Sequence, residues 1–361
     1  MKTITGKVSC LVACLLFIPC LAPGSGQGDH DQFRQACSNL AAKAEQSGSI
    51  AVAGKDNWLF LSSELRHLGA GQFWGEAASR ASRAAKPEAA DPLPAILDFS
   101  DQLKKAGVEL ILVPVPPKAV VYPEMLPGLN NPDTTARLDK ALQEFYGLLR
   151  AKGVKVMDLA EFFIGNKNDP HRPLYCRTDS HWSGSGCVLA AGKISSEIRA
   201  LVGENPGGKQ AFTSNWQAIE IGGDLRPALN NADAPREKLS IRKISRPGSG
   251  EPVASGAGGR VILLGDSHNL VFHAGDDMLS SGAGLPDQLA FELGEEVELV
   301  AVRGSGATPA RVNLMRRAQQ MNNYWANKKC VIWCFSAREF TESDGWRKVP
   351  VAPKKADEAS E

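Results

Sequence analysis

Residues 94–113 read PAILDFSDQLKKAGVELILV and contain two elements joined by a glycine. Apolar side chains recur at helical spacing through Pro94–Ala106, so this part predicts an amphipathic helix. Gly107 follows, and glycine is the usual residue for the left-handed turn that ends a helix. The apolar run Val108–Val113 then has the composition of a buried strand. The stretch therefore predicts a helix that returns into the core as a strand.

The same order of helix, glycine and strand occurs again, with a helix at Leu138–Ala151, Gly153 and a strand at Val154–Leu159. Two such units are typical of the α/β class, in which helices flank a parallel sheet. Further strands are predicted at Arg260–Leu264, Val297–Val302 and Cys330–Phe335, and further helices at Ser183–Val202 and Pro309–Asn327. No sharp change of composition divides the chain, so residues 30–348 are expected to form one domain.

The overall composition excludes several classes of protein. The chain has 361 residues, of which 43% are hydrophobic and 22% charged, as in folded globular proteins and unlike disordered ones. Its formal net charge of +1 supplies no general field to hold a nucleic acid. We therefore expect no nucleic-acid partner.

The first 26 residues have the layout of an export signal. Lys2 and Lys7 precede an apolar run from Val8 to Ala22, and small residues follow it. The run is shorter than the ~20 residues that span a bilayer. We expect residues 1–26 to be a cleaved signal peptide, with a short uncleaved anchor as the alternative.

Two other segments lack a clear pattern. Residues 203–258 are rich in glycine and proline, with Arg242 and Arg246 among polar residues, and predict an irregular insertion. A loop of this length within a domain is usually functional or disordered. The charged segment Val349–Glu361 is expected to be a disordered tail.

Cysteines outside the export signal are expected to pair in part, because an oxidising compartment favours disulfides. They are Cys37, Cys176, Cys187, Cys330 and Cys334. Cys330 and Cys334 lie on one predicted strand, too far apart to bridge each other. No spacing typical of a zinc site occurs, so no metal is expected.

The strongest local motif is Gly265-Asp-Ser-His-Asn269, directly after a predicted strand. Ser267 at the carboxyl end of a parallel strand lies where α/β folds bind ligands. Such a turn also points backbone N–H groups at one spot, as an oxyanion requires. The alternative is an ordinary Gly-Asp-Ser turn.

Serine needs a base, and the base needs an orienting group. Thr178-Asp-Ser-His-Trp182 offers both, because residues two apart in an extended segment project to the same side. His181 would take the proton of Ser267, and Asp179 would orient the imidazole. Alone, this pair is more often a capped turn beside a packed histidine. His273 is a weaker rival for the base.

Together these residues resemble the periplasmic alginate O-acetyltransferases of the AlgJ/AlgX type, which are SGNH-hydrolase-like proteins. Counterparts in the same order are Gly54–Leu61, Leu112–Lys118 and Val331–Trp333 with Arg338-Glu339. The resemblance extends from about Ser49 to Phe340. We expect no carbohydrate-binding module like that of the AlgX branch, and an outline closer to AlgJ.

The resemblance implies an SGNH-like sheet with a triad of Ser267, His181 and Asp179. The Asp-His pair precedes the serine, the reverse of most SGNH hydrolases. It also suggests site-lining residues, with Gly304 as a second oxyanion donor and Arg303 as a contact for an acidic sugar. The remaining candidates are Asn269 and, more weakly, Lys118, while Trp58 and Tyr122 are expected to be packing residues.

The function that the resemblance implies is transfer of acetyl groups to hydroxyls of an exported, alginate-like polysaccharide through a serine acyl-enzyme. No cofactor is expected. The implied partners are a membrane-bound acyltransferase as acetyl donor and other export or modification proteins, in the periplasm or tethered to the inner membrane. Two alternatives remain open: an acetylesterase with the same triad, and a non-catalytic polysaccharide-binding subunit.

Overall fold

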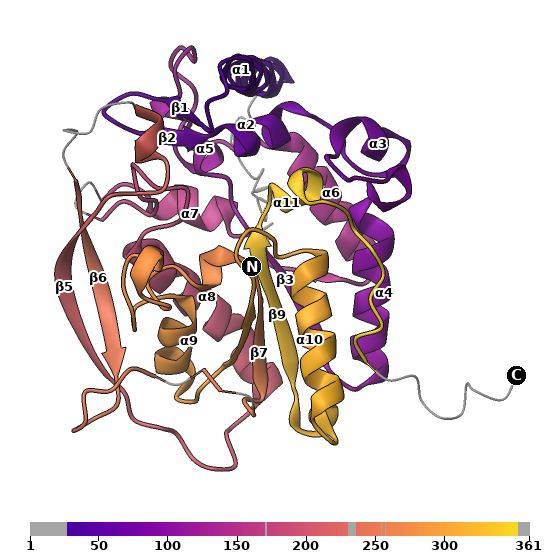
Figure 1. Cartoon of the computed structure of the whole chain (residues 1–361), viewed down its shortest axis with the longest axis vertical. Helices are drawn as coiled ribbons and strands as arrows, with labels where there is room; N and C mark the ends of the chain where they lie inside the picture. Colours follow the sequence, from indigo (N-terminus) through magenta and orange to yellow (C-terminus); the bar gives the residue numbers. More distant parts are fainter. Residues whose placement is uncertain (1–26, 170–171, 230–235, 254, 257, 353–361) are drawn as a thin grey trace, which may run out of the picture.

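A computed structural model describes the whole chain except residues 1–26, 170–171, 230–235, 254, 257 and 353–361 (Figure 1). Its centre is a five-stranded sheet in the order β4-β3-β9-β7-β8, in which every neighbouring pair is parallel. The strands are β3 (Glu109–Val115), β4 (Lys155–Val156), β7 (Val261–Gly265), β8 (Glu298–Ala301) and β9 (Cys330–Ser336). The predicted α/β class is confirmed.

Helices cover both faces of this sheet. In Figure 1, α4 (Pro92–Lys105) and α10 (Thr308–Gln320) lie on one side, and α8 (Gly184–Val202) and α9 (Leu285–Leu293) lie on the other. The burial of β7 and β9 on both faces explains their continuous apolar sequences, because water reaches neither face. The remaining helices are α1 (Gln27–Gln46), α2 (Ser62–Gly69), α3 (Ala78–Ala81), α5 (Lys118–Val121), α6 (Lys140–Ala151), α7 (Ala160–Asn166) and α11 (Glu339–Glu342).

Strand register brings the loops that carry the chemistry to one edge. Val115 of β3 pairs with Ser336 of β9, and Gly265 of β7 pairs with Cys334 of the same strand. The carboxyl ends of β3, β7 and β9 therefore lie level with one another. The segments that follow them, including Ser267, start from this common edge.

The prediction of an irregular insertion at 203–258 was wrong in its centre. Strands β5 (Thr213–Ile221) and β6 (Glu237–Ser245) form an antiparallel pair at the outer side of the domain (Figure 1). Ile219 on β5 and Leu239 and Ile241 on β6 share the inner face. β5 is exposed at most positions, so its apolar periodicity is weak and the strand was missed.

Two other expectations need correction, and one pair of strands was missed. Strand β4 is shorter than predicted because Asp158 leaves the sheet, where it pairs with Arg137 and accepts a hydrogen bond from the N–H of Ala160. Helix α10 ends at Gln320, and Asn323, in the left-handed conformation, precedes a separate 3-10 helix at Tyr324–Asn327. Another antiparallel pair, β1 (Ala51–Ala53) and β2 (Leu59–Leu61), was not predicted.

The prediction of a disordered tail from Val349 was wrong for residues 349–352. Val349 and Val351 are buried, and the side chain of Gln102 bonds the backbone at Val349 and Val351. The rest of the tail, from 353, and the predicted export signal at 1–26 lie outside the described residues. Within the described part, none of the helices has the length and apolar character needed to span a membrane.

The five described cysteines carry free thiols, so the expected pairing was wrong for them. All five are buried, and Cys37, Cys176, Cys187 and Cys334 each have a thiol pKa raised by desolvation. Cysteine here acts as a small apolar core residue.

Gly265 is the position where the fold tolerates a side chain least. A Cβ there would lie 1.6 Å from the Cys334 carbonyl oxygen and 2.5 Å from Asn269 Nδ2. Gly265→Ala should therefore lower the free energy of unfolding by about 3 kcal/mol or more, measured by urea denaturation. Gly147→Ala is the matched control, because it lies in helix α6 with nothing near its Cβ, and it should stabilise by about 0.5–1 kcal/mol. Equal effects of the two changes would contradict this packing.

Candidate active site

The turn after β7 is fixed by its own aspartate. Asp266 Oδ1 accepts a hydrogen bond from the N–H of His268 (3.0 Å), and Oδ2 accepts one from the N–H of Ser336 at the end of β9 (2.7 Å). Ser267 begins a short 3-10 turn through Asn269. The serine is thus held at the carboxyl edge of the sheet by one contact within its own turn and one contact to the end of β9.

Ser267, His181 and Asp179 form a continuous hydrogen-bonded chain. Ser267 Oγ lies 2.7 Å from His181 Nε2, and His181 Nδ1 lies 2.7 Å from Asp179 Oδ1. A carboxylate only accepts, so Nδ1 carries the proton and Nε2 is free to accept the serine hydroxyl. The three side chains are buried, which shields the chain from water. This is the geometry in which a histidine can activate a serine.

The carboxylate of Asp179 and the protonated ring of His181 stabilise each other's charged forms. Burial raises the pKa of Asp179, but the hydrogen bond and charge of His181 outweigh it, and the pKa falls to about 2. Burial lowers the pKa of His181, but the hydrogen bond and charge of Asp179 reverse this, and the net pKa is raised. Asp179 therefore stays ionised and favours the imidazolium that forms when His181 takes a proton.

A second imidazole lies close to the first. The ring centres of His181 and His268 are 4.8 Å apart. Burial lowers the pKa of His268, although Asp266 acts in the opposite direction. His268 is therefore neutral at neutral pH and does not place a competing positive charge beside His181.

The β5–β6 region holds the Asp179 segment in place through hydrogen bonds. The sequence analysis did not predict this support. The N–H of Asp224 donates to Asp179 Oδ2 (2.9 Å), while the carboxylate of Asp224 accepts from the N–H and the hydroxyl of Ser180. Glu237, at the start of β6, accepts from the N–H groups of Arg177 and Thr178. The Gly222-Gly223-Asp224 run could have indicated this close contact, because a Cβ on Gly223 would lie 2.1 Å from the Thr178 carbonyl.

Lys118 lies behind the triad rather than in a substrate site. The ammonium of Lys118 donates to the backbone oxygens of Asp179 (2.6 Å) and Leu59 (2.8 Å). The backbone N–H of Lys118 donates to the buried carboxylate of Glu64 in α2. Burial lowers the pKa of Lys118, although the acidic groups around it act in the opposite direction. Lys118 thus holds the Asp179 backbone and offers no exposed charge. Trp58 and Tyr122 are packed together in the core, as expected.

The loop after β8 reaches the serine turn through a residue that was not predicted. A Cβ on Gly306 would lie 3.0 Å from the Asp266 nitrogen, whereas Gly304 is exposed and has nothing near its Cβ position. The carbonyl of Gly306 accepts from the Trp333 indole (2.7 Å), and Ser305 donates to Glu339 (2.7 Å). Gly306, rather than Gly304, therefore packs against the nucleophile turn.

Two further predicted site residues, Arg303 and Asn269, contact residues other than the triad. The same holds for His273, the alternative base. Arg303 is exposed and pairs with Asp277 at 2.7 Å. Asn269 is fully buried, and its amide donates to the carbonyls of Cys334 (2.7 Å) and Asp266, so it joins β7 to β9 instead of lining a site. His273 Nδ1 lies 2.8 Å from Asp287, and its Nε2 contacts Ser255, not Ser267.

Among the residues that the structure describes, one group of side chains has the spacing to hold a cation. Ligand atoms of Asp179, His181 and Asp224 lie within 4.8 Å of one another. Both ring nitrogens of His181 are already engaged, with Asp179 and with Ser267. The donor set therefore fits a proton relay better than a metal site.

The fold and site together define an SGNH-hydrolase-like protein. Residues 51–337 match the family described as the SGNH hydrolase-like domain of the acetyltransferase AlgX, and the chain belongs to this family. The resemblance found in the residues is thereby confirmed.

The relatives are proteins of pseudomonads. The chain is 30% identical over 148 residues to the probable alginate O-acetylase AlgJ of Pseudomonas aeruginosa, covering 41% of this chain and 33% of that one. It is 28% identical over 222 residues to the AlgJ of Pseudomonas syringae pv. tomato, covering 60% and 50%. The matches thus span between a third and a half of these relatives.

Two solved structures share the fold. The O-acetyltransferase domain of Pseudomonas putida AlgJ superimposes with a TM-score of 0.56 at 20% identity, covering 81% of this chain and 92% of that one. Pseudomonas aeruginosa AlgX gives 0.58 at 20% identity, covering 80% and 62%. At this identity the likeness concerns the fold alone.

The buried ammonium of Lys118 should matter for the reactivity of Ser267. Lys118→Met removes the donor to the Asp179 backbone, so labelling of Ser267 by a sulfonyl fluoride should slow at least roughly tenfold. Lys167→Met is the matched control, because Lys167 is also buried and its Nζ binds Val121 and Glu124 away from the triad. It should cost stability but leave the labelling rate of the folded protein unchanged. Equal slowing in both variants would mean that Lys118 acts only through stability.

Proposed function

We propose that this protein is an O-acetyltransferase that acetylates hydroxyls of an exported, alginate-like polysaccharide through an acetylated Ser267. The observation that carries the proposal is the buried chain from Asp179 through His181 to Ser267, with both contacts at 2.7 Å. Membership of the acetyltransferase family and the relatives named alginate O-acetylases support the choice of acyl group and acceptor.

In the first half-reaction, Ser267 Oγ attacks the carbonyl carbon of an acetyl ester while His181 Nε2 takes the hydroxyl proton. Asp179 stabilises the resulting imidazolium. The N–H of Ser267 and an N–H of the 303–306 loop are the proposed donors to the tetrahedral oxyanion. The intermediate then collapses, the ester C–O bond breaks, and His181 returns the proton to the departing alcohol. Ser267 is left as the acetyl ester.

In the second half-reaction, a sugar hydroxyl takes the place of the departed alcohol. His181 removes its proton, the sugar oxygen attacks the acetyl carbon, and the new tetrahedral intermediate releases Ser267, which recovers its proton from His181. Water could attack in the same way, which would make the protein an acetylesterase. The family description as an acetyltransferase favours the sugar.

The donor and the location belong to the proposal too. Acetyl-CoA is cytoplasmic, so an exported enzyme needs a membrane-bound acyltransferase that passes acetyl groups outward. We place the protein in the periplasm, within a group of export and modification proteins. Arg303, which was predicted to contact an acidic sugar, forms an ion pair with Asp277, and Arg242 and Arg246 form ion pairs with Glu292 and Glu296. A non-catalytic binding subunit would have no need for an ordered Asp179–His181–Ser267 chain.

The Ser267→Ala variant distinguishes an enzyme from a non-catalytic binding subunit. The wild-type protein should consume 4-nitrophenyl acetate and transfer acetyl groups to alginate oligosaccharides, detected by mass spectrometry. The variant should lose about 10⁴-fold in rate or more, because the nucleophile is absent. Ser255→Ala is the control, since Ser255 contacts His273 and should leave the rate unchanged. Ester consumption without acetylated sugar would indicate the esterase, and unchanged turnover in Ser267→Ala would refute both.

The pH dependence should report His181. The base must be neutral, so kcat/KM should fall as pH decreases through the His181 pKa, with a midpoint above the ordinary value of about 6.5. In Asp179→Asn the charge that raises this pKa is gone, and the midpoint of the His181 ring titration by NMR should move down. A midpoint at or below 6.5 in the wild type, or no shift in the variant, would contradict this electrostatic role.

A further inference from the structure

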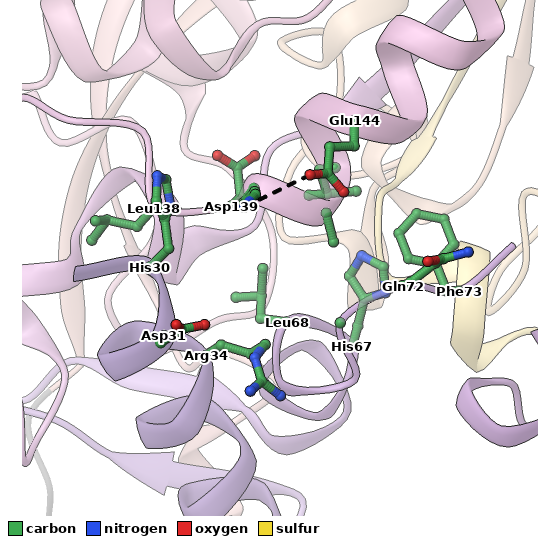
Figure 2. A pocket seen from close by; sticks show the side chains of 14 residues that line it. His30, Asp31, Arg34, His67, Leu68, Gln72, Phe73, Leu138, Asp139 and Glu144 are labelled. Carbon is green, nitrogen blue, oxygen red and sulfur yellow. Dashed lines mark ion pairs between the residues drawn. The ribbon is translucent and has the colours of Figure 1, made fainter. Parts of the chain in front are cut away.

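A cavity separate from the triad lies between α1, α2 and the start of α6. It has a volume of about 240 Å³. Figure 2 shows Asp31 and Arg34 of α1 on one side and Asp139 and Glu144 on the other, with Leu68 and His67 between them. The cavity is smaller than the roughly 300–1,000 Å³ of pockets for drug-sized molecules. It therefore suits a ligand of about one sugar ring.

Helix α2 contributes residues both to this cavity and to the support of the triad. Glu64 of α2 binds the N–H of Lys118, which in turn holds the Asp179 backbone. His67, one turn further along the same helix, lines the cavity. Glu64 and His67 are three residues apart, so one side of α2 contacts both the support of Asp179 and the cavity.

His67 presents an unsatisfied acceptor. Its Nδ1 lies 3.0 Å from the hydroxyl of Thr341, whose own proton is directed to Glu342 (2.9 Å). Nδ1 must therefore be the protonated nitrogen that donates to Thr341, and Nε2 carries a lone pair. Burial lowers the pKa of His67 to about 3, so the ring is neutral. His67 Nε2 is buried and has no hydrogen-bond partner among the described residues, an arrangement that favours a ligand hydroxyl there.

The lining carries the carboxylates of Asp31, Asp139 and Glu144 and the cations Arg34 and Lys140. Asp139 forms a two-bond pair with Arg137, and Glu144 lies 4.0 Å from Lys140. Within the part of the chain that is described, Arg34 forms no ion pair, and it is one of the residues that line the cavity (Figure 2). An unpaired guanidinium is a preferred partner for a carboxylate.

We propose that this cavity binds one hexuronate unit. A ring hydroxyl donates to His67 Nε2, the carboxylate pairs with Arg34, and the apolar face of the ring lies against Leu68. This inference rests on the proposed function, because the cavity would be a second place, away from the triad, at which the enzyme holds its acidic polymer. No bond is made or broken there, so binding can be measured independently of catalysis.

Sodium glucuronate and glucose are the matched probes, because they differ only at C6, which is a carboxylate in glucuronate and a hydroxymethyl group in glucose. Glucuronate should bind with roughly millimolar affinity, followed by calorimetry and by a shift of the His67 Nε2 resonance in ¹⁵N NMR. Glucose should bind at least about tenfold more weakly, since it cannot pair with Arg34. Equal binding of the two sugars, or no glucuronate binding, would overturn the proposal.

Arg34→Gln tests the assigned cation, and Lys43→Gln is its control. Both residues are exposed on α1, but Lys43 lies in the last turn, outside the cavity lining. Arg34→Gln should weaken glucuronate binding roughly tenfold, and Lys43→Gln should leave it unchanged. Both variants should hydrolyse 4-nitrophenyl acetate at the wild-type rate. Unchanged glucuronate binding in Arg34→Gln would overturn the site, whereas absence of ester turnover in all proteins would refute the proposed function and not the cavity.

Discussion

Burying the carboxylate of Asp179 is the constraint on which the candidate site depends. An isolated buried charge costs several kcal/mol, so each of its oxygens needs donors. His181 satisfies Oδ1 through its ring and its backbone, and the N–H of Asp224 satisfies Oδ2. The contacts around the site bring donors from the 178–181 segment and from the loop before β6 to this single group.

The same constraint explains why distant parts of the chain meet here. The backbone of Asp179 is held by Lys118, which follows β3, and Lys118 is in turn fixed by Glu64 of α2. On the opposite side, Ser267 is positioned by β7 and β9 through Asp266. The parallel register places these segments at one edge, so the central strands determine where the nucleophile meets its base.

Most of the central fold could be predicted because buried strands carry a strong local signal. The runs at Val108–Val113, Arg260–Leu264 and Cys330–Phe335 became β3, β7 and β9 with small changes at their ends. The exposed strand β5 carried no such signal. The triad residues could be proposed from two motifs, but the supports could not, because Asp224 and Gly306 act through contacts between segments far apart in sequence. Arg303 and Asn269 resemble site residues by their position at strand ends, and only the fold reveals their other partners.

The central claim is that Ser267 carries the acetyl group during turnover. Acid quenching of the protein during reaction with an acetyl ester, followed by peptide mass spectrometry, measures this directly. The account predicts an acetyl group on the peptide containing Ser267 that disappears when an acceptor sugar is added. Turnover without any acetylated Ser267, or the same acetylation level in Ser267→Ala, would contradict it.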